Sequence, residues 1–382
     1  MRLWASPFLA AASESCAADG GEASGQCSAA TTSCGCGALQ RGSFEAPSVA
    51  AAAHQNHGLS SGPGESEEEA GVIFMDGGIF EMGLILQDEG DPTIFAMDGE
   101  GPRREVSVEP FGLGAFEVSN SRFSKFVAST GYITEAERFG WSFAVEAFLS
   151  KTVNDNITQQ VDAAPWWLPV HGADWRHPNG VDSSIDDVMD HPVVHVSYAD
   201  AVNFCQWSML GGRLPTEAEW EFAARGQKQS RRFPWGNSML TGKDRSTHRM
   251  NIWQSEFDSQ LEEQGTNLYQ FGRDSLAFVK DFYAANNTAL DGFAQTAPVS
   301  TYGPQNKLGF HNMVGNVWEW TTTDWASVES EGNPPTKVKK GGSFLCHRAT
   351  CNRFRNSARM MFTADSSASN VGFRCAYTRG AG

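Results

Sequence analysis

The chain has 382 residues, 19% of them charged, and a formal net charge of −16 at pH 7. This acidity argues against a nucleic-acid-binding protein, because phosphate backbones require a basic surface. No stretch reaches the roughly 18 consecutive apolar residues of a membrane-spanning helix, so no membrane span is predicted. The 40% hydrophobic content, with 12 Trp and 25 Phe, is typical of a loop-rich enzyme that buries a sizeable core.

Residues 1–70 are predicted to form a leader. This segment is rich in Ala, Gly and Ser and ends in the acidic run 65–69. It cannot bury enough apolar surface to offset the entropy lost on ordering, so we expect it to be disordered or removed. Arg2 and the short apolar run 3–12 make a weak secretory signal peptide, with an incorrectly assigned start codon as the alternative.

A folded domain is predicted over residues 71–378, beginning with an apolar strand. Helices are predicted where a hydroxyl side chain can cap the first turn, after Ser119, after Ser197 and after Thr216. The last two hydroxyl residues are followed three positions later by an acidic residue, which completes a capping box. The remainder is expected to be short strands and loops, with residues 258–290 as a polar surface insertion around one short helix.

Two cysteines, Cys205 and Cys375, are isolated in apolar surroundings and far apart in the sequence. An oxidising compartment would join them in a disulfide that closes a long loop, and a reducing one would leave two buried thiols. The sequons at Asn156 and Asn286 permit glycosylation in the secretory pathway. Taken alone, these features leave the compartment open.

The segment 341–351 carries a second pair of cysteines, Cys346 and Cys351, five positions apart and preceded by Gly-Gly-Ser. A pair at this spacing can close a disulfide, or it can bind one soft metal ion through two thiolates. The arginines of the following segment, 353–359, would favour the thiolate form. The chain has no P-loop and no Gly-x-Gly-x-x-Gly after a strand, so no organic cofactor is predicted.

Three segments together resemble the formylglycine-generating enzymes, also called sulfatase-modifying factors. They are the cysteine-bearing segment 341–351, the segment 365–375 and the Gly-Asn-Val-Trp-Glu-Trp run at 315–320. Matching runs extend from residue 72 to residue 377. The resemblance implies an α+β, single-domain fold, a variant of the C-type-lectin-like fold with little regular secondary structure. Because that fold also serves binding proteins and catalytically silent relatives, function must be argued from the site.

The resemblance implies a copper-dependent oxidase. Such relatives use O2 to convert the cysteine of a Cys-x-Pro-x-Arg motif in nascent sulfatases to Cα-formylglycine. They bind Cu(I) through a cysteine pair that corresponds to Cys346 and Cys351, and catalytically silent paralogues lack that pair. The further active-site residues implied by the matching motifs are Ser343, His347, Trp318 and Asn370.

The resemblance also implies two structural calcium ions, bound by the amide, carboxylate and backbone carbonyl oxygens that Ca²⁺ prefers. The first site is assigned to Asn251, Ile252, Asp291 and Phe293, and the second to Asn312, Gly315, Val317 and Glu319. The chain between Phe257 and Asp291 is longer than in relatives, so the ligands of the first site must meet across an insertion.

By the same resemblance, the protein is expected in the endoplasmic reticulum lumen as a glycoprotein, with Cys205 and Cys375 in a structural disulfide. Cys34 and Cys36 resemble leader cysteines through which vertebrate-type relatives form mixed disulfides with a thioredoxin-like retention partner. Residues 378–382 carry no Lys-Asp-Glu-Leu-type signal, which favours retention by such a partner.

One departure from the family pattern and two alternatives remain. Trp141 stands where relatives carry an acidic residue, so no carboxylate is assigned to the substrate arginine.

The first alternative function is that of a non-catalytic paralogue that binds sulfatases. The presence of Cys346 and Cys351 disfavours it, because binding needs no paired thiols. The second is a thiol–disulfide oxidoreductase acting through the same pair, which would need no copper. Sugar binding is disfavoured because no Glu-Pro-Asn tripeptide is present.

Overall fold

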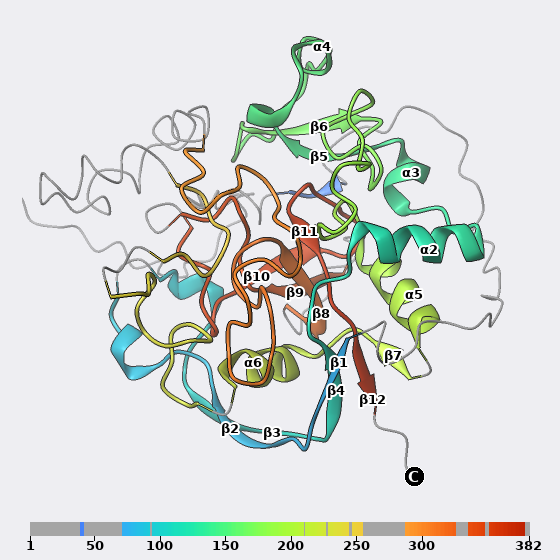
Figure 1. The fold of residues 1–382 in the computed structure, drawn as a ribbon. Coiled ribbons are helices and arrows are strands. Elements are labelled where there is room, and N and C mark those ends of the chain that lie inside the picture. Colours follow the sequence, from blue (N-terminus) through green and yellow to red (C-terminus); the bar gives the residue numbers. More distant parts are fainter. Residues whose placement is uncertain are drawn as a thin grey trace, which may run out of the picture. The chain divides into compact units, whose positions relative to one another are not determined.

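Short strands build two four-stranded sheets and two two-stranded ribbons in the part of the chain that the computed structural model describes (Figure 1). That part comprises residues 39–41, 71–91, 94–209, 211–226, 228–243, 247–254, 287–325, 335–347 and 351–378. These residues belong to one compact unit, Thr31–Gly382. Most of the predicted leader and most of the predicted insertion lie outside the described residues.

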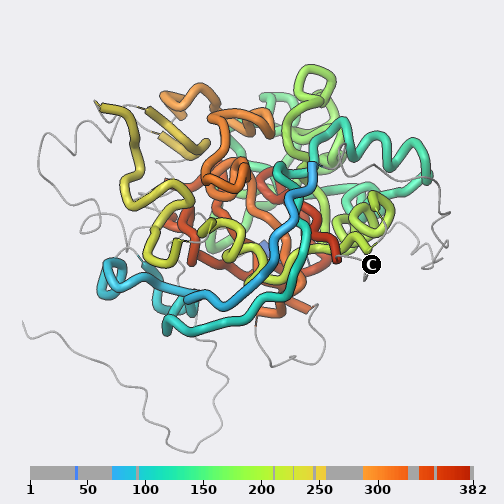
Figure 2. The backbone as a smooth tube through the Cα atoms, turned by 60° about the horizontal axis from the view of Figure 1, so that its bottom comes forward, coloured from blue at the N-terminus to red at the C-terminus, as the bar shows by residue number. Residues whose placement is uncertain are grey.

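The first sheet joins the beginning and the end of the described domain. Its strands are β1 (Val72–Met75), β4 (Phe111–Gly114), β7 (Gly212–Arg213) and β12 (Ala376–Thr378). They pair in the antiparallel order β1-β4-β12-β7. Figure 2 shows the blue β1 running beside β4, with the red end of the chain next to them. The apolar strand predicted at the start of the domain is confirmed as β1.

The second sheet brings two predicted site residues together. Its strands are β8 (Trp318–Asp324), β9 (Thr336–Lys340), β10 (Arg359–Thr363) and β11 (Val371–Gly372), in the order β10-β9-β8-β11. β11 runs parallel to β8, with Val371 opposite Trp318. Asn370 therefore lies beside Trp318, whose backbone N–H donates to the Asn370 carbonyl oxygen at 2.9 Å.

The two ribbons are antiparallel pairs. They consist of β2 (Gly78–Met82) with β3 (Arg104–Val108), and β5 (Trp141–Val145) with β6 (Trp167–His171). β5 also meets a distant segment, because Phe143 forms an isolated bridge with Ala368. This contact places β5 against the segment that leads to Asn370.

Each described α-helix begins after a Ser or Thr N-cap, and three of these helices were predicted. The described helices are α2 (Asn120–Thr130), α3 (Glu135–Phe139), α4 (Lys151–Asn154), α5 (Tyr198–Ser208) and α6 (Glu217–Arg225). Ser119 caps α2, and complete capping boxes start α5 at Ser197 and α6 at Thr216, so all three predicted helices are confirmed. Three 3-10 turns cover Leu86–Asp88, Ala96–Asp98 and Glu146–Phe148. None of the helices among the described residues is long and apolar enough to cross a membrane.

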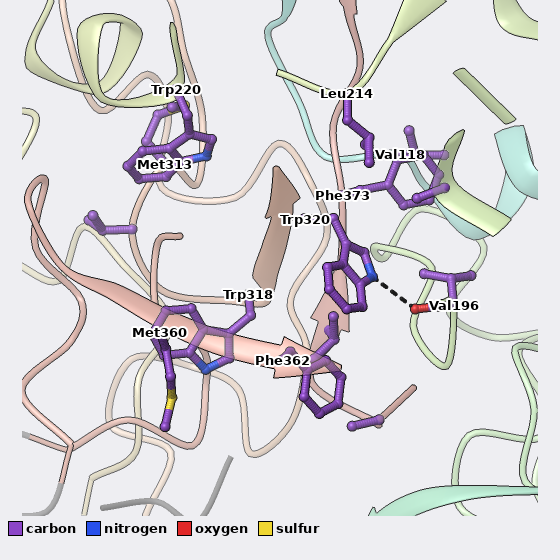
Figure 3. Close-up of a cluster of buried hydrophobic side chains, with 14 of the residues drawn as sticks. Val118, Val196, Leu214, Trp220, Met313, Trp318, Trp320, Met360, Phe362 and Phe373 are labelled. Carbon is purple, nitrogen blue, oxygen red and sulfur yellow. Dashed lines mark hydrogen bonds between the residues drawn. The ribbon is translucent and has the colours of Figure 1, made fainter. Parts of the chain in front are cut away.

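Aromatic side chains fill the core around the second sheet. Figure 3 shows Trp318 and Trp320 of β8 together with Met360 and Phe362 of β10. The Trp320 ring stacks on Phe362 with centroids 5.4 Å apart, and its Nε1 donates to the Val196 carbonyl oxygen at 3.0 Å. Because a buried indole N–H requires an acceptor, this bond fixes the orientation of Trp320 in the core.

A disulfide ties α5 to the segment before β12. It joins Cys205 and Cys375, which are 170 residues apart in the sequence, with Cα atoms 5.5 Å apart. The pairing predicted for an oxidising compartment is therefore present in the structure. Closing so long a loop restricts the unfolded chain and stabilises the folded one.

Candidate active site

Cys346 and Cys351 lie close together with their side chains fully buried. Their Sγ atoms are 2.7 Å apart, longer than a disulfide bond of about 2.05 Å. Two backbone hydrogen bonds shape this region, from Cys346 N to Ser343 O at 2.8 Å and from Cys351 N to His347 O at 2.7 Å. Both thiols can therefore reach a single ion or a single reacting atom.

Ser343 is held beside this pair by two donors. Its Oγ accepts hydrogen bonds from Asn370 Nδ2 at 2.9 Å and from Leu345 N at 3.3 Å. Gly342, the preceding residue, has φ of +73°, and a Cβ there would lie 3.0 Å from the Arg353 carbonyl oxygen. The Gly-Gly-Ser motif is explained by this lack of space and by the left-handed backbone.

Trp318 and His347 are also buried, and the structure connects both to the thiol region through the backbone. The His347 carbonyl oxygen accepts from Cys351 N, and Trp318 N donates to Asn370 O. The Trp318 ring lies 5.2 Å from Lys339 Nζ, and its Nε1 has no hydrogen-bond partner within the described part of the chain. Five of the six predicted catalytic residues thus lie in one hydrogen-bonded region, and Trp318 adjoins it through Asn370.

The arginines that follow Cys351 anchor their own segment, a role that the sequence did not indicate. Each is paired with a carboxylate at 2.5–2.8 Å. The pairs are Arg353 with Asp98, Arg355 with Glu100, and Arg359 with Glu217. Asp98 and Glu100 come from a loop 255 residues earlier in the sequence, so these buried bonds tie that loop to the segment that carries Cys351.

The first calcium set meets across the insertion, as its assignment requires. The Asp291 carboxylate accepts hydrogen bonds from Ile252 N at 2.9 Å and Phe293 N at 3.1 Å. Gln254, which sequence reasoning missed, donates to the same carboxylate through Nε2 at 2.6 Å. Asn251 Oδ1 is buried and has no hydrogen-bond partner among the described residues. The Asp291 carboxylate and the unpartnered amide oxygen of Asn251 are the donor types that Ca²⁺ prefers.

Glu319 of the second calcium set interacts with a buried carboxylate that was not predicted, Glu117. Glu319 accepts two hydrogen bonds from Arg374 and one from Trp220 Nε1, each 2.7 Å long. Glu117 accepts from Asn312 Nδ2 at 2.9 Å. Burial, reinforced by the charge of Glu319, raises the pKa of Glu117 to about 8. Asn312 Oδ1 is buried and lacks a hydrogen-bond partner within the described residues, so an amide oxygen and two buried carboxylates are the donors that a hard cation would use here.

Asn316 connects the two sets and was also missed. Its Oδ1 accepts from Asn251 Nδ2 at 3.1 Å, and its Nδ2 donates to Glu117 Oε1 at 3.0 Å. Its carbonyl oxygen accepts from Phe344 N at 2.8 Å, next to Ser343. The position of Asn316 inside the Gly-Asn-Val-Trp run was the available signal, because Asn tolerates the left-handed backbone that it adopts, with φ of +61°.

Among the described residues, no group of three or more His, Cys, Asp and Glu side chains is arranged so that it could hold a metal ion. The candidate metal sites are therefore the thiol pair and two oxygen sets that mix amides, carboxylates and backbone carbonyls. The carbonyls assigned to these sets belong to Ile252 and Phe293 in the first and to Gly315 and Val317 in the second. Oxygen sets of this composition suit a hard ion, and the thiol pair suits a soft one.

His195 lies fully buried behind the segment that carries Asn370. Its Nε2 donates to the Pro178 carbonyl oxygen at 2.8 Å, so its Nδ1 accepts from Ser142 Oγ at 2.7 Å. Burial lowers the pKa of His195 to about 4. The ring is therefore neutral in the folded protein at pH 7.

We expect acid to destabilise the protein through His195. An unfolded histidine takes up a proton near pH 6.5, whereas the folded one resists it until about pH 4, so the stabilisation is complete above pH 6.5 and is lost as the pH falls to 4. In His195→Gln, the side chain keeps a donor and an acceptor but does not titrate. The decrease of about 3 kcal/mol in the free energy of unfolding between pH 6.5 and pH 4 should therefore be absent. Urea unfolding at several pH values measures it as the difference between wild type and variant. Asp200, whose pKa is raised to about 6 by burial, acts in the opposite direction in both proteins and cancels in the difference. Parallel curves for the two proteins would contradict the prediction.

Comparison with known proteins identifies the family. Residues 60–379 match the family model of the sulfatase-modifying factor enzyme 1-like domain. The formylglycine-generating enzyme of Mus musculus is 45% identical, covering 97% of this chain and 92% of the mouse protein. That of Thermomonospora curvata is 43% identical, covering 80% of this chain and 93% of its own.

Two further relatives bear on function and on fold. The inactive C-alpha-formylglycine-generating enzyme 2 of Bos taurus is 38% identical over 80% of this chain and 87% of the bovine protein. Among solved structures, PvdO from Pseudomonas aeruginosa has a TM-score of 0.51 at 18% identity, covering 81% of this chain and 94% of PvdO, which shows a shared fold only. The predicted α+β fold and the predicted family are confirmed: the chain belongs to the sulfatase-modifying factor enzyme family.

Proposed function

We propose that this protein oxidises the cysteine of a Cys-x-Pro-x-Arg segment in sulfatase polypeptides to Cα-formylglycine, with O2 as the oxidant and Cu(I) held by Cys346 and Cys351. The observation that carries the proposal is the buried pair of thiols, with Sγ atoms 2.7 Å apart. It occurs in a chain that is 45% identical to the mouse formylglycine-generating enzyme over almost its whole length.

The donor chemistry of the pair supports copper. Two sulfur ligands suit Cu(I), whose role when bound would be the one-electron chemistry that O2 reduction requires and a position for the substrate thiolate. The protein supplies the dry surroundings, because both cysteines are fully buried. It also holds a hydroxyl group in place: Ser343 Oγ accepts from Asn370 and Leu345, so its own proton can still be donated to a substrate or oxygen atom.

The reaction requires an external reductant. A CH2SH group plus O2, two electrons and two protons yields CHO, hydrogen sulfide and water, so atoms and charge balance only if another thiol supplies the electrons. We therefore expect turnover of a synthetic Cys-x-Pro-x-Arg peptide only with copper, O2 and a thiol reductant together. Mass spectrometry that detects CHO in place of CH2SH checks this result. Conversion that is unaffected by removing O2 would overturn the proposed oxidant.

A thiol–disulfide oxidoreductase is the second candidate, and the Sγ–Sγ distance favours it too. Two thiols this close need little movement to form a bond. Such an enzyme would exchange disulfides with a substrate without copper, whereas the oxidase would not. A metal-free assay of disulfide exchange, run beside the peptide assay, separates the two reactions.

The proposal includes two structural calcium ions. Their support is the unpartnered Oδ1 atoms of Asn251 and Asn312 within the described residues. Asn312 is hydrogen-bonded through Nδ2 to the buried Glu117, and Asn251 precedes Ile252, whose backbone N–H donates to the buried Asp291. We expect calcium removal with EGTA to lower the Tm by about 5 °C, because binding of a ligand at a hundredfold excess over its Kd stabilises a protein by about 2.7 kcal/mol. Calcium, but not magnesium, should restore the Tm in differential scanning calorimetry. An identical Tm in EGTA and in calcium would count against both sites.

The proposal also places the protein in the endoplasmic reticulum lumen. The Cys205–Cys375 disulfide supports an oxidising compartment. Asn156 is exposed and open to glycosylation, whereas the Asn286 sequon begins outside the described residues. Retention by a thioredoxin-like partner through Cys34 and Cys36, which also lie outside them, remains a proposal that secretion of the Cys34→Ser and Cys36→Ser double variant would support.

A further inference from the structure

Three residues of the predicted leader are described, and two of them are buried against the domain. Leu39 is 0% exposed and Arg41 is 4% exposed, whereas Gln40 between them is exposed. The Arg41 backbone N–H donates to Ser366 Oγ at 3.0 Å across a sequence separation of 325 residues. A segment expected to be disordered or removed therefore has a specific binding place on the folded domain.

The side chain of Arg41 fills a site shaped for a guanidinium group. Its carbon Cζ lies 4.2 Å from the Phe139 ring centroid and 4.4 Å from that of Trp141. Nε donates to Asp365 O at 3.0 Å, Nη1 to Trp141 O at 2.9 Å, and Nη2 to Ser367 Oγ at 3.0 Å. The rigid planar fork of arginine matches three acceptors in different directions, which a lysine ammonium could not do.

The electrostatic surroundings also suit a cation. Burial lowers the pKa of Arg41 to about 10, and the carboxylates of Asp365, Glu135 and Asp200 oppose that effect. The side chain therefore stays protonated at neutral pH. If Arg41 were removed, three partly or fully buried carboxylates would lose their shared cation.

A directed chain of hydrogen bonds runs inward from Arg41. His195 Nδ1 must accept from Ser142 Oγ, because Nε2 donates to a carbonyl oxygen. Ser142 Oγ then accepts from Ser367 Oγ at 2.7 Å, which leaves Ser367 Oγ as the acceptor for Arg41 Nη2. Each group has one consistent role, so Arg41 completes a satisfied buried network.

The same network holds the segment that ends at Asn370. Phe143 N donates to Ser367 O at 3.3 Å, and Ser369 N donates to Phe143 O at 2.9 Å, so β5 and residues 367–369 are joined on both sides of the bridge. The next residue, Asn370, donates to Ser343 Oγ beside the thiol pair. Arg41, which binds residues 365–367, therefore acts three residues away from a catalytic amide.

We propose that Arg41 is a positioning residue of the active site: it binds in cis to the guanidinium site formed by Phe139, Trp141, Asp365 and Ser367, and so fixes the segment that presents Asn370 to Ser343. The kinetic consequence rests on the proposed function, whereas the structural consequence does not. Arg41, although it belongs to the predicted leader, thus contributes to the structure of the active site.

The test compares Arg41→Ala, Arg41→Lys and wild type as full-length, copper-loaded protein, with Gln40→Ala as the matched control in an exposed neighbour. Hydrogen–deuterium exchange should accelerate by about tenfold at the Phe143 and Ser369 amides in Arg41→Ala, because donors to buried acceptors are lost. On the peptide substrate, kcat should fall by about tenfold with KM unchanged. The reason is that the substitution alters the geometry of Asn370 and leaves the amount of folded protein the same.

Two further readouts separate positioning from simple stabilisation. Arg41→Lys keeps the charge but cannot reach three acceptors, so it should behave like Arg41→Ala. Added methylguanidinium should restore part of the kcat of Arg41→Ala and leave Gln40→Ala unchanged. Full restoration of kcat by lysine would overturn the geometric role.

The possible failures are distinguishable. If wild type forms no formylglycine, the proposed function fails, and the exchange experiment still decides whether Arg41 holds residues 365–370. Unchanged exchange in Arg41→Ala overturns the docking. If the Ser369 amide loses protection from exchange but kcat is unchanged, the positioning role is overturned. A raised kcat/KM in Arg41→Ala would also overturn it, because the bound Arg41 segment would then hinder access to the site.

Discussion

Cys346→Ser is expected to form no formylglycine from a Cys-x-Pro-x-Arg peptide and to bind no Cu(I). The substitution replaces one of two soft sulfur ligands with a hard hydroxyl oxygen, and a single thiolate at Cys351 does not make a bis-thiolate site. Serine nearly preserves the volume of cysteine, so the folded state should survive. Mass spectrometry of the peptide and the ratio of copper to protein after dialysis measure the two losses.

The control for this variant is Cys34→Ser, which removes a thiol from the leader and leaves the Cys346–Cys351 pair intact. It should retain both copper and activity in the purified protein. Persistent formylglycine formation by Cys346→Ser would rule out the bis-thiolate mechanism. If the wild-type protein binds no copper but still exchanges disulfides, the result would instead favour the oxidoreductase.

Arg374→Met is expected to destabilise the fold by about 4 kcal/mol, the typical cost of breaking a buried ion pair by removing one partner. The guanidinium is fully buried and donates to both carboxylate oxygens of Glu319 at 2.7 Å. It also donates to the carbonyl oxygens of Gly114 and Ala115 at 3.1 Å and of His311 at 2.8 Å. Methionine fills the volume but leaves the Glu319 charge and three carbonyl groups without this donor.

Urea unfolding in EGTA, where no calcium can balance the charge of Glu319, gives the free energy of unfolding for this comparison. Arg103→Met is the matched control, because its pair with Glu81 is 3.1 Å long and partly exposed, and such pairs contribute below about 1 kcal/mol. Adding Glu319→Gln to Arg374→Met should recover part of the stability, since no buried charge is then left unpaired. Equal losses in Arg374→Met and Arg103→Met would show that Arg374 does not anchor this region.

Local features were predictable because their causes lie close together in the chain. A hydroxyl N-cap and the acidic residue three positions later act within one helical turn, so the starts of α5 and α6 followed from Ser197 and Thr216. The thiol pair likewise depends on two cysteines five residues apart and on a glycine turn. Family resemblance then supplied the roles of more distant residues such as Asn370.

The partners of buried charges were not predictable in this way. A buried arginine requires a hydrogen-bond acceptor, but the sequence does not identify that acceptor. The chain has 45 acidic side chains, and tertiary packing determines which of them lies beside a given arginine. Arg353 pairs with Asp98 and Arg355 pairs with Glu100, each across a sequence separation of 255 residues. Glu117 has no local motif at all and was revealed only by its contacts with Asn312 and Asn316.

The family, the starts of α2, α5 and α6 and the close pair of cysteines could be predicted from local motifs and family resemblance. The burial of Arg41 and the pairing of Glu319 with Arg374 could not be predicted and became visible in the folded protein. Composition describes the average behaviour of a segment, whereas burial depends on a complementary surface elsewhere in the chain. The composition of the leader predicts disorder, yet Leu39 is buried and Arg41 contacts aromatic rings and hydrogen-bond acceptors of the folded domain.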